Sequence, residues 1–156
     1  MKVLFLCTAN SCRSILSEAV FNHLAPAGMK AYSAGSQPKG AVHPLSIQTL
    51  QKAGISAAGL SSKSSDVHEA LAPDLVITVC DKAAGEACPV FFGPATKAHW
   101  GIADPSEYQG SPEEIEAAFD ATLERIKTRV QAFLALPLKQ MSSEQLKAEM
   151  ALIGTL

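Results

Sequence analysis

Hydrophobic residues occur along this chain in two patterns that alternate over most of its length. The first pattern is a short continuous run, such as residues 3–6 before Cys7 and residues 74–79 before Cys80. Continuous runs of this length, bounded by turn-forming residues, are typical of strands buried on both faces of a parallel sheet. These runs predict four strands, at residues 3–6, 29–34, 74–79 and 97–101.

The second pattern places hydrophobic residues three or four positions apart, which predicts amphipathic helices between the strands. Leu16, Val20 and Leu24 form one such stripe, and Ile47 and Leu50 form another that we expect to face the sheet. Capping boxes, in which a serine is followed three residues later by Glu or Gln, begin the last two helices. The predicted helices cover residues 14–24, 43–53, 111–134 and 142–154.

Strands that alternate with helices imply parallel βαβ units, so we expect an α/β fold with a four-stranded parallel sheet flanked by helices. The length of 156 residues fits a single domain over residues 1–156, with a helical extension over about residues 140–156. Ligands of such sheets bind beyond the carboxyl ends of the strands. Cys7 and Cys80 both follow predicted strands at that end, so we expect the two side chains to lie near each other.

The segment between the first strand and the first helix has the composition of an oxyanion site. Inward-facing amides and a helix N-terminus favour an anion, and the Arg13 guanidinium is suited to a tetrahedral oxyanion. Asn10 can adopt a left-handed backbone conformation that turns the amides inward, and the Ser14 hydroxyl is placed to donate to the Cys7 sulfur. The same surroundings are expected to lower the pKa of Cys7 and make it a nucleophile. The expected oxyanion-binding residues are Thr8, Ala9, Asn10, Ser11, Cys12, Arg13 and Ser14.

Plainer interpretations of the cysteines stay open at this point. Cys7 could be a buried residue at a strand end, with Arg13 on the surface beyond it. Cys80 and Cys88 could be unrelated free cysteines, although together with Cys7 they would suit a disulfide relay. A zinc site made from all four cysteines is disfavoured, because neither pair has the close spacing of zinc ligands.

Composition narrows the classes of function. A formal net charge of −2 argues against a general nucleic-acid binder, and the hydrophobic runs are too short to span a membrane. The N-terminal residues lack the features of a signal peptide, so we expect a cytoplasmic protein. In that compartment four cysteines are more often catalytic or metal-binding than structural disulfides. We also expect a monomer, because the sequence shows no large exposed hydrophobic face.

Three motifs resemble a known family. Residues 7–14, CTANSCRS, resemble the CxxNxCRS signature of the low-molecular-weight tyrosine phosphatase fold. They are still more similar to the arsenate reductases built on that fold, of the thioredoxin-coupled type. Residues 77–90, ITVCDKAAGEACPV, resemble the redox segment of those reductases, and residues 99–105, HWGIADP, match their HWGxxDP pattern. Phosphatases of this fold generally lack the second pair of cysteines.

The resemblance implies a three-layer fold of the low-molecular-weight tyrosine phosphatase type and a thiol-based reduction of arsenate. Cys7 would attack arsenate held by Arg13, with Asp104 as the general acid. Cys80 would then attack Cys7 and release arsenite, and Cys88 would attack Cys80, leaving a Cys80–Cys88 disulfide. The electron donor would be thioredoxin, or alternatively glutathione with glutaredoxin. No metal or organic cofactor is needed.

Two further positions follow from the resemblance. Cys12 is expected to be a bystander, with a regulatory disulfide to Cys7 as the alternative. Some relatives hold a potassium ion beside the loop, but this chain has Lys63 where they have a carboxylate. The Lys63 ammonium is expected to replace the ion. The other matching positions are Asn10, Glu18 and Ser33.

Two rival functions remain at this stage. A phosphomonoesterase would use Cys7, Arg13 and Asp104 through a phosphocysteine and give Cys80 and Cys88 no role. The aromatic residue with which such phosphatases grip a phenyl ring is in question, because Ser106 follows Pro105 here and Tyr108 comes later. A non-enzymatic oxyanion or redox sensor would bind without turnover.

Overall fold

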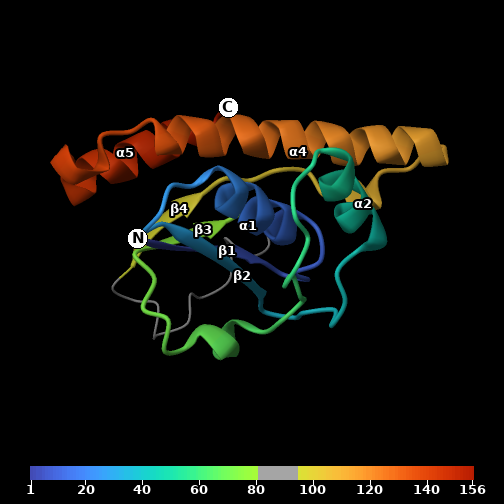
Figure 1. Ribbon diagram of the computed structural model, residues 1–156, viewed down its shortest axis with the longest axis horizontal. Coiled ribbons are helices and arrows are strands. Elements are labelled where there is room, and N and C mark those ends of the chain that lie inside the picture. The colour runs from blue at the N-terminus through green and yellow to red at the C-terminus, as the bar shows by residue number, and fades with distance from the viewer. Residues whose placement is uncertain (81–94) are drawn as a thin grey trace.

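The structure, a computed structural model, describes residues 1–80 and 95–156. A parallel sheet with strand order β2-β1-β3-β4 lies at its centre (Figure 1). Every neighbouring pair of strands is parallel, as the alternation of strands and helices predicts. The four strands are β1 (Lys2–Cys7), β2 (Lys30–Gly35), β3 (Leu75–Thr78) and β4 (Thr96–His99).

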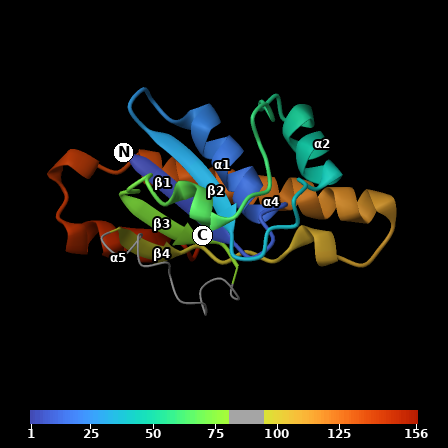
Figure 2. The ribbon, with the colours of Figure 1, turned by 90° about the horizontal axis from the view of Figure 1, so that it is seen from below.

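The longer helices lie on one side of the sheet, and the short 3-10 helix η1 (Ser65–His68) lies on the other (Figure 1). Seen from below in Figure 2, α5 lies beside β4, the edge strand with which it is in contact. Within residues 1–80 and 95–156, the α-helices are α1 (Arg13–Leu24), α2 (Pro44–Lys52), α4 (Pro112–Leu134) and α5 (Ser143–Ile153). The described part of the chain also contains the 3-10 helices η3 (Pro105–Glu107) and η4 (Leu138–Gln140).

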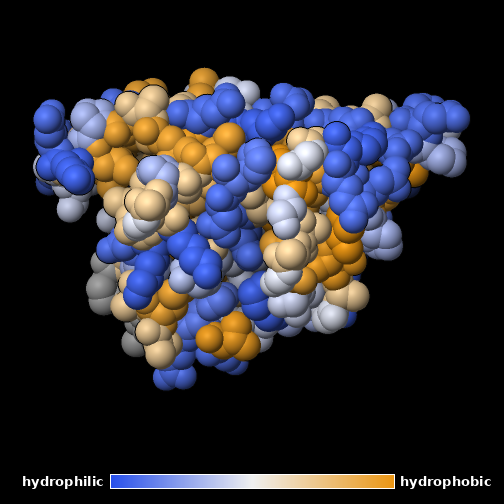
Figure 3. Space-filling view, in the orientation of Figure 1, coloured by the Kyte–Doolittle hydropathy of each residue, from blue (hydrophilic) through white to orange (hydrophobic). Residues whose placement is uncertain are grey.

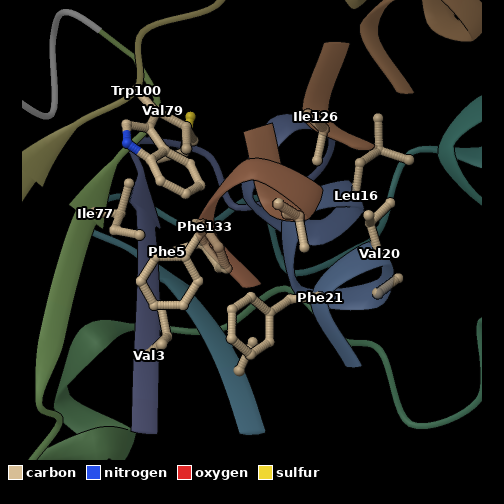
Figure 4. Close-up of a cluster of buried hydrophobic side chains, with 14 of the residues drawn as sticks. Val3, Phe5, Leu16, Val20, Phe21, Ile77, Val79, Trp100, Ile126 and Phe133 are labelled. Carbon is tan, nitrogen blue, oxygen red and sulfur yellow. The ribbon is translucent and has the colours of Figure 1, made fainter. Parts of the chain in front are cut away.

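Alternate residues of β1 supply the cores on the two faces of the sheet. Val3 and Phe5 face the helices, where Phe5 contacts the rings of Phe21 and Trp100 (Figure 4). Leu4 faces the opposite side, where a smaller cluster is covered in part by η1. Full burial of each such side chain contributes about 1.5–3 kcal/mol, so this packing fixes the strand that carries Cys7.

Both capping boxes form as predicted. The Ser111 hydroxyl accepts a hydrogen bond from the Glu114 amide, and the Ser142 hydroxyl accepts one from the Gln145 amide. Figure 3 shows hydrophilic side chains over the outward side of α4. Its inward side joins the core through residues such as Phe133 (Figure 4). The helix is therefore amphipathic, as predicted, with its hydrophobic side buried.

Two details differ from the sequence predictions. The second helix was expected to face the sheet, but α2 packs mainly against α4 and α1, because α1 and α4 already cover that side of the sheet. Leu50 is buried in the core there, whereas Ile47 is only half-buried. The sequence predicts no helix between residues 53 and 74, where the structure has η1, which begins at Ser65.

The last helix is part of the main core. Met150 and Ile153 are buried in the same hydrophobic cluster as β1 and α1. Within residues 1–80 and 95–156, no helix is long and apolar enough to cross a membrane.

Candidate active site

The loop between β1 and α1 is held by its carbonyl groups. The carbonyl of Thr8 accepts from the Gln37 amide at 3.0 Å, and that of Ala9 accepts from the Lys39 amide at 3.0 Å. The carbonyl of Ser11 accepts from the His43 amide as well, also at 3.0 Å. Because the carbonyls point outward to neighbouring segments, the amides of the loop turn toward its concave side, as an anion site requires.

Asn10 is the residue that bends this loop. Its φ of +48° lies in the left-handed region, as predicted. Its buried side chain accepts from the Lys63 amide at 2.9 Å and donates to the Ser14 hydroxyl at 2.8 Å. The prediction that Ser14 donates to Cys7 is not met in this structure, because Cys7 is hydrogen-bonded to Cys80 instead.

Gly35, at the end of β2, allows the loop to approach the sheet closely. A Cβ atom added there would lie 2.4 Å from the Thr8 carbonyl oxygen and 2.8 Å from that of Cys7. Real Cβ atoms essentially never approach an oxygen this closely, so only glycine fits without a shift of the loop.

Cys7 and Cys80 lie side by side, as the strand topology predicts. Their thiols are hydrogen-bonded to each other, and the Cys80 sulfur also lies 3.7 Å from the Thr8 hydroxyl. Both cysteines are buried. The two sulfurs are thus adjacent before any reaction begins.

The prediction of a lowered pKa for Cys7 is wrong in this state. The hydrogen bond with Cys80 and burial raise the pKa of Cys7, and the opposing effects of Arg13 and the Thr8 amide are smaller. A thiol that is both desolvated and paired with a second thiol is held in its protonated form. Thiolate formation at Cys7 therefore depends on its contact with Cys80.

Arg13 and Asp104 face each other across the mouth of the loop. One Arg13 nitrogen lies 3.4 Å from Asp104 Oδ2, and another donates to the Ile102 carbonyl at 3.1 Å. The other Asp104 oxygen accepts from the amide and hydroxyl of Ser106, at 2.9 Å and 2.7 Å. Asp104 is therefore held in place and points toward the oxyanion cradle.

A cavity of about 790 Å³ opens over these groups. Its walls include Thr8, Arg13, Cys80 and Asp104, so the residues singled out from three separate motifs line one space. The structure brings Cys7, Arg13, Cys80 and Asp104 together; Cys88 lies outside the described residues. Tyr108 is exposed, and it is not among the described residues that line the cavity.

Lys63 lies beside the loop, where a cation was expected. Its ammonium lies 3.8 Å from Glu18 Oε1, and the Ser33 hydroxyl donates to the same oxygen at 2.6 Å. Burial lowers the pKa of Lys63, and Glu18 partly opposes this effect. In the part of the chain that the structure describes, no group of three or more His, Cys, Asp or Glu side chains is arranged to hold a metal ion.

Cys12 is buried under the loop with its sulfur 3.7 Å from the Ser11 hydroxyl. Burial raises the pKa of Cys12, which makes it a weak nucleophile in this state. These surroundings agree with the expectation that Cys12 is a bystander in the reaction.

Sequence reasoning missed two groups that support the site. His43 and Ser46, at the start of α2, both bond to the Ser11 carbonyl. Ser106 anchors Asp104, the N-cap of η3, by donating its amide and hydroxyl to the Asp104 carboxylate. The Asp-Pro-Ser sequence at residues 104–106 carries a capping signal that could have indicated the second, whereas the first depends on a tertiary contact with no local signature.

Comparison with known proteins places this geometry in a family. Residues 2–151 match the family described as low molecular weight phosphotyrosine protein phosphatase. An arsenate reductase of Bacillus subtilis (strain 168) is 34% identical over 131 residues, which cover 84% of this chain and 93% of that protein.

Two solved structures are similar in fold. A structure of an arsenate reductase in the phosphate-binding state has a TM-score of 0.70 and 26% identity, and the match covers 86% of this chain and 96% of that one. A thioredoxin-dependent arsenate reductase of Corynebacterium glutamicum has a TM-score of 0.58 and 28% identity, covering 83% of this chain and 61% of that one. With its sheet order, its strand–loop–helix cradle and these similarities, this chain belongs to the low-molecular-weight phosphotyrosine protein phosphatase family.

Proposed function

We propose that this protein reduces arsenate to arsenite with electrons from thiols. The observation that carries the proposal is the pairing of the Cys80 thiol with the Cys7 thiol beneath Arg13 and Asp104. A phosphatase needs a single nucleophilic sulfur, whereas a reductase needs a second thiol within reach of the first. The similarity to arsenate reductases supports the same assignment.

The first half of the reaction forms a bond between sulfur and arsenic. The loop amides and the Arg13 guanidinium hold the arsenate, and their charge favours the Cys7 thiolate once an oxyanion is bound. The Cys7 sulfur attacks arsenic, and the arsenic–oxygen bond to the leaving hydroxyl breaks. Asp104 donates a proton to that hydroxyl, which leaves as water.

The second half transfers two electrons to arsenic. The Cys80 sulfur attacks the Cys7 sulfur, the sulfur–arsenic bond breaks, and its electron pair stays on arsenic, which leaves as arsenite. Cys7 and Cys80 are then joined by a disulfide. Cys88 attacks Cys80, which frees Cys7 as a thiolate and leaves a Cys80–Cys88 disulfide for an external dithiol to reduce.

The donor in this proposal is thioredoxin, with glutathione and glutaredoxin as the alternative system. The proposed relay requires three thiols, and thiols persist in a reducing compartment, which favours the cytoplasm. We propose that the protein acts as a monomer, because the nucleophile, the acid and the first resolving thiol all come from one chain.

The test is consumption of NADPH with arsenate, comparing thioredoxin and its reductase with glutathione and glutaredoxin. We expect turnover with at least one system, and the faster system identifies the donor. Cys80→Ser is expected to stop cycling, because the Cys7 adduct has no neighbouring thiol. Absence of turnover with both donors, together with rapid hydrolysis of an aryl phosphate that survives Cys80→Ser, would refute the proposal in favour of a phosphatase. Oxyanion binding without turnover of either substrate would indicate a sensor.

A further inference from the structure

Arg129, on α4, is a buried cation that the proposed reaction does not use. Its side chain is 1% exposed. Its guanidinium donates to the carbonyls of Trp100 at 2.8 Å, Gly101 at 3.1 Å, Gly154 at 3.0 Å and Leu156 at 3.2 Å. Burial of a charged group is unfavourable unless its donors are satisfied, so a core position that needs packing alone would favour an apolar side chain.

The four carbonyls belong to two segments that are far apart in sequence. Trp100 and Gly101 begin the stretch that leads from β4 to Asp104, whereas Gly154 and Leu156 follow α5. Arg129 therefore joins the segment after α5 to the start of the acid loop, which is defined here as residues 100–104. Figures 1 and 2 show α5 beside β4, where this junction lies.

Two further contacts tighten the same junction. The Trp100 indole donates to the Met150 carbonyl at 3.0 Å. A Cβ atom added to Gly154 would lie 2.6 Å from the His99 carbonyl oxygen, so α5 approaches the end of β4 as closely as backbone permits. The first residues of the acid loop are thus held by Arg129, by the hydrogen bond between Trp100 and Met150, and by the close approach of Gly154.

The last residues of the acid loop meet the oxyanion cradle. The carbonyl of Ile102, the residue after Gly101, accepts from Arg13 at 3.1 Å, and Asp104 faces Arg13 at 3.4 Å. Gly154 also lines the active-site cavity together with Arg13 and Asp104. A displacement at Gly101 would therefore move the carbonyl and carboxylate that orient Arg13.

We propose that Arg129 is a positioning residue for the acid loop and that the segment after α5 completes this support through Gly154 and Leu156. The proposal rests on the proposed function to the extent that Asp104 acts as the acid. Burial lowers the pKa of Arg129 to about 10, so the side chain stays charged at neutral pH and keeps its donors.

The test compares Arg129→Met and Arg129→Lys with Val130→Ala. Val130 is the next residue of α4, is fully buried in the core, and provides no side-chain hydrogen bond, so Val130→Ala is the control for lost packing. For each variant we would measure the melting temperature, kcat and its pH profile for arsenate reduction, and the Kd of inorganic phosphate.

We expect Arg129→Met to lower kcat by at least about tenfold and to change the acid-dependent limb of the pH profile, since misplacement of about an ångström near the reacting atoms has effects of this size. The phosphate Kd should rise by a smaller factor than kcat falls, because the loop amides still bind the ion even where the orientation of Arg13 changes. Arg129→Lys should restore part of kcat, and Val130→Ala should lower the melting temperature while keeping kcat.

A second variant covers the case in which Arg129→Met does not fold. Gly154→Ala places a methyl group against the His99 carbonyl and should lower kcat in the same way, without removing a buried charge. Wild-type kcat and pH profile in the folded Arg129 and Gly154 variants, or a loss equal to that of Val130→Ala, would overturn the positioning role.

The same variants are also assayed for aryl phosphate hydrolysis, which uses the same cradle and acid. Failure of the wild-type protein to reduce arsenate would count against the proposed function alone, because the positioning role would still be decided by the hydrolysis rates. The single tryptophan of the chain, Trp100, adds a reading that needs no turnover: its emission should shift in Arg129→Met relative to Val130→Ala.

Discussion

Replacement of Gly35 by alanine would test whether the approach of β2 to the loop determines the geometry of the oxyanion cradle. The added Cβ atom would lie 2.4 Å from the Thr8 carbonyl oxygen, whereas ordinary contact begins near 3.4 Å. The difference is about 1 Å, and either the loop or the end of β2 must move by that amount. Neither neighbour is a flexible side chain, because both close atoms, the carbonyl oxygens of Thr8 and Cys7, belong to the backbone.

A shift of this size would displace the loop residues that follow Cys7. Misplacement of reacting groups by 1 Å can cost about 100-fold in rate. We therefore expect Gly35→Ala to lower kcat/KM for arsenate by about two orders of magnitude and to weaken phosphate binding in parallel, because the loop amides move with Thr8.

The assay is steady-state reduction of arsenate together with calorimetric titration of phosphate. Gly110→Ala is the matched control, because a Cβ at that position meets mainly the flexible side chain of Glu114. Circular dichroism and the melting temperature establish that both variants are folded. Wild-type phosphate affinity in folded Gly35→Ala would refute the reasoning, since it would mean that the cradle does not depend on this approach.

Three more predictions concern individual side chains of the site. Cys80→Ala removes the hydrogen bond that contributes most to the raised pKa of Cys7, so the pKa should fall and the pH profile of Cys7 alkylation by iodoacetamide should move to lower pH; an unchanged profile would contradict the thiol pairing. Asp104→Asn should lower kcat by about 10²–10⁴-fold with little change in phosphate Kd, which steady-state kinetics and calorimetry would measure; equal loss in both would indicate a binding role. Exchange of potassium for sodium should leave kcat unchanged, because the Lys63 ammonium already lies beside Glu18, and strong potassium activation would show that it does not replace the ion.

The positions of the strands and the cradle could be predicted from the sequence because local patterns determine them. The apolar run before Cys7, the left-handed preference of Asn10 and the two capping boxes each specify a backbone conformation without reference to distant residues. Parallel topology then places Cys7 and Cys80 at one edge of the sheet.

The ionisation of Cys7 could not be predicted in the same way. The sequence shows that Arg13 follows the cysteine, which favours thiolate, but not that the Cys80 sulfur is hydrogen-bonded to it in a buried space. The direction of the pKa shift depends on which of these effects is larger, and that balance exists only in the folded protein.

The contact of the C-terminal helix with Arg129 and β4 could not be predicted from the sequence either. Arg129 lies within a helix whose outward side carries many charged residues, so nothing in its spacing distinguishes it from an exposed residue. Its burial follows from the packing of α5 on β4, a contact between elements that are far apart in the sequence.

The central position of β1 has a consequence for how the enzyme would lose activity on heating. Its amides and carbonyls pair with β2 on one side and β3 on the other, whereas β4 is an edge strand. Backbone amides of such a central strand exchange with solvent only through global unfolding, whereas edge elements open in local fluctuations that require less free energy. Hydrogen exchange should therefore find the nucleophile on the slowest-exchanging segment and the acid loop next to a faster one. Partial opening would then separate the acid from the thiol while the thiol itself stays buried and protected from oxidation.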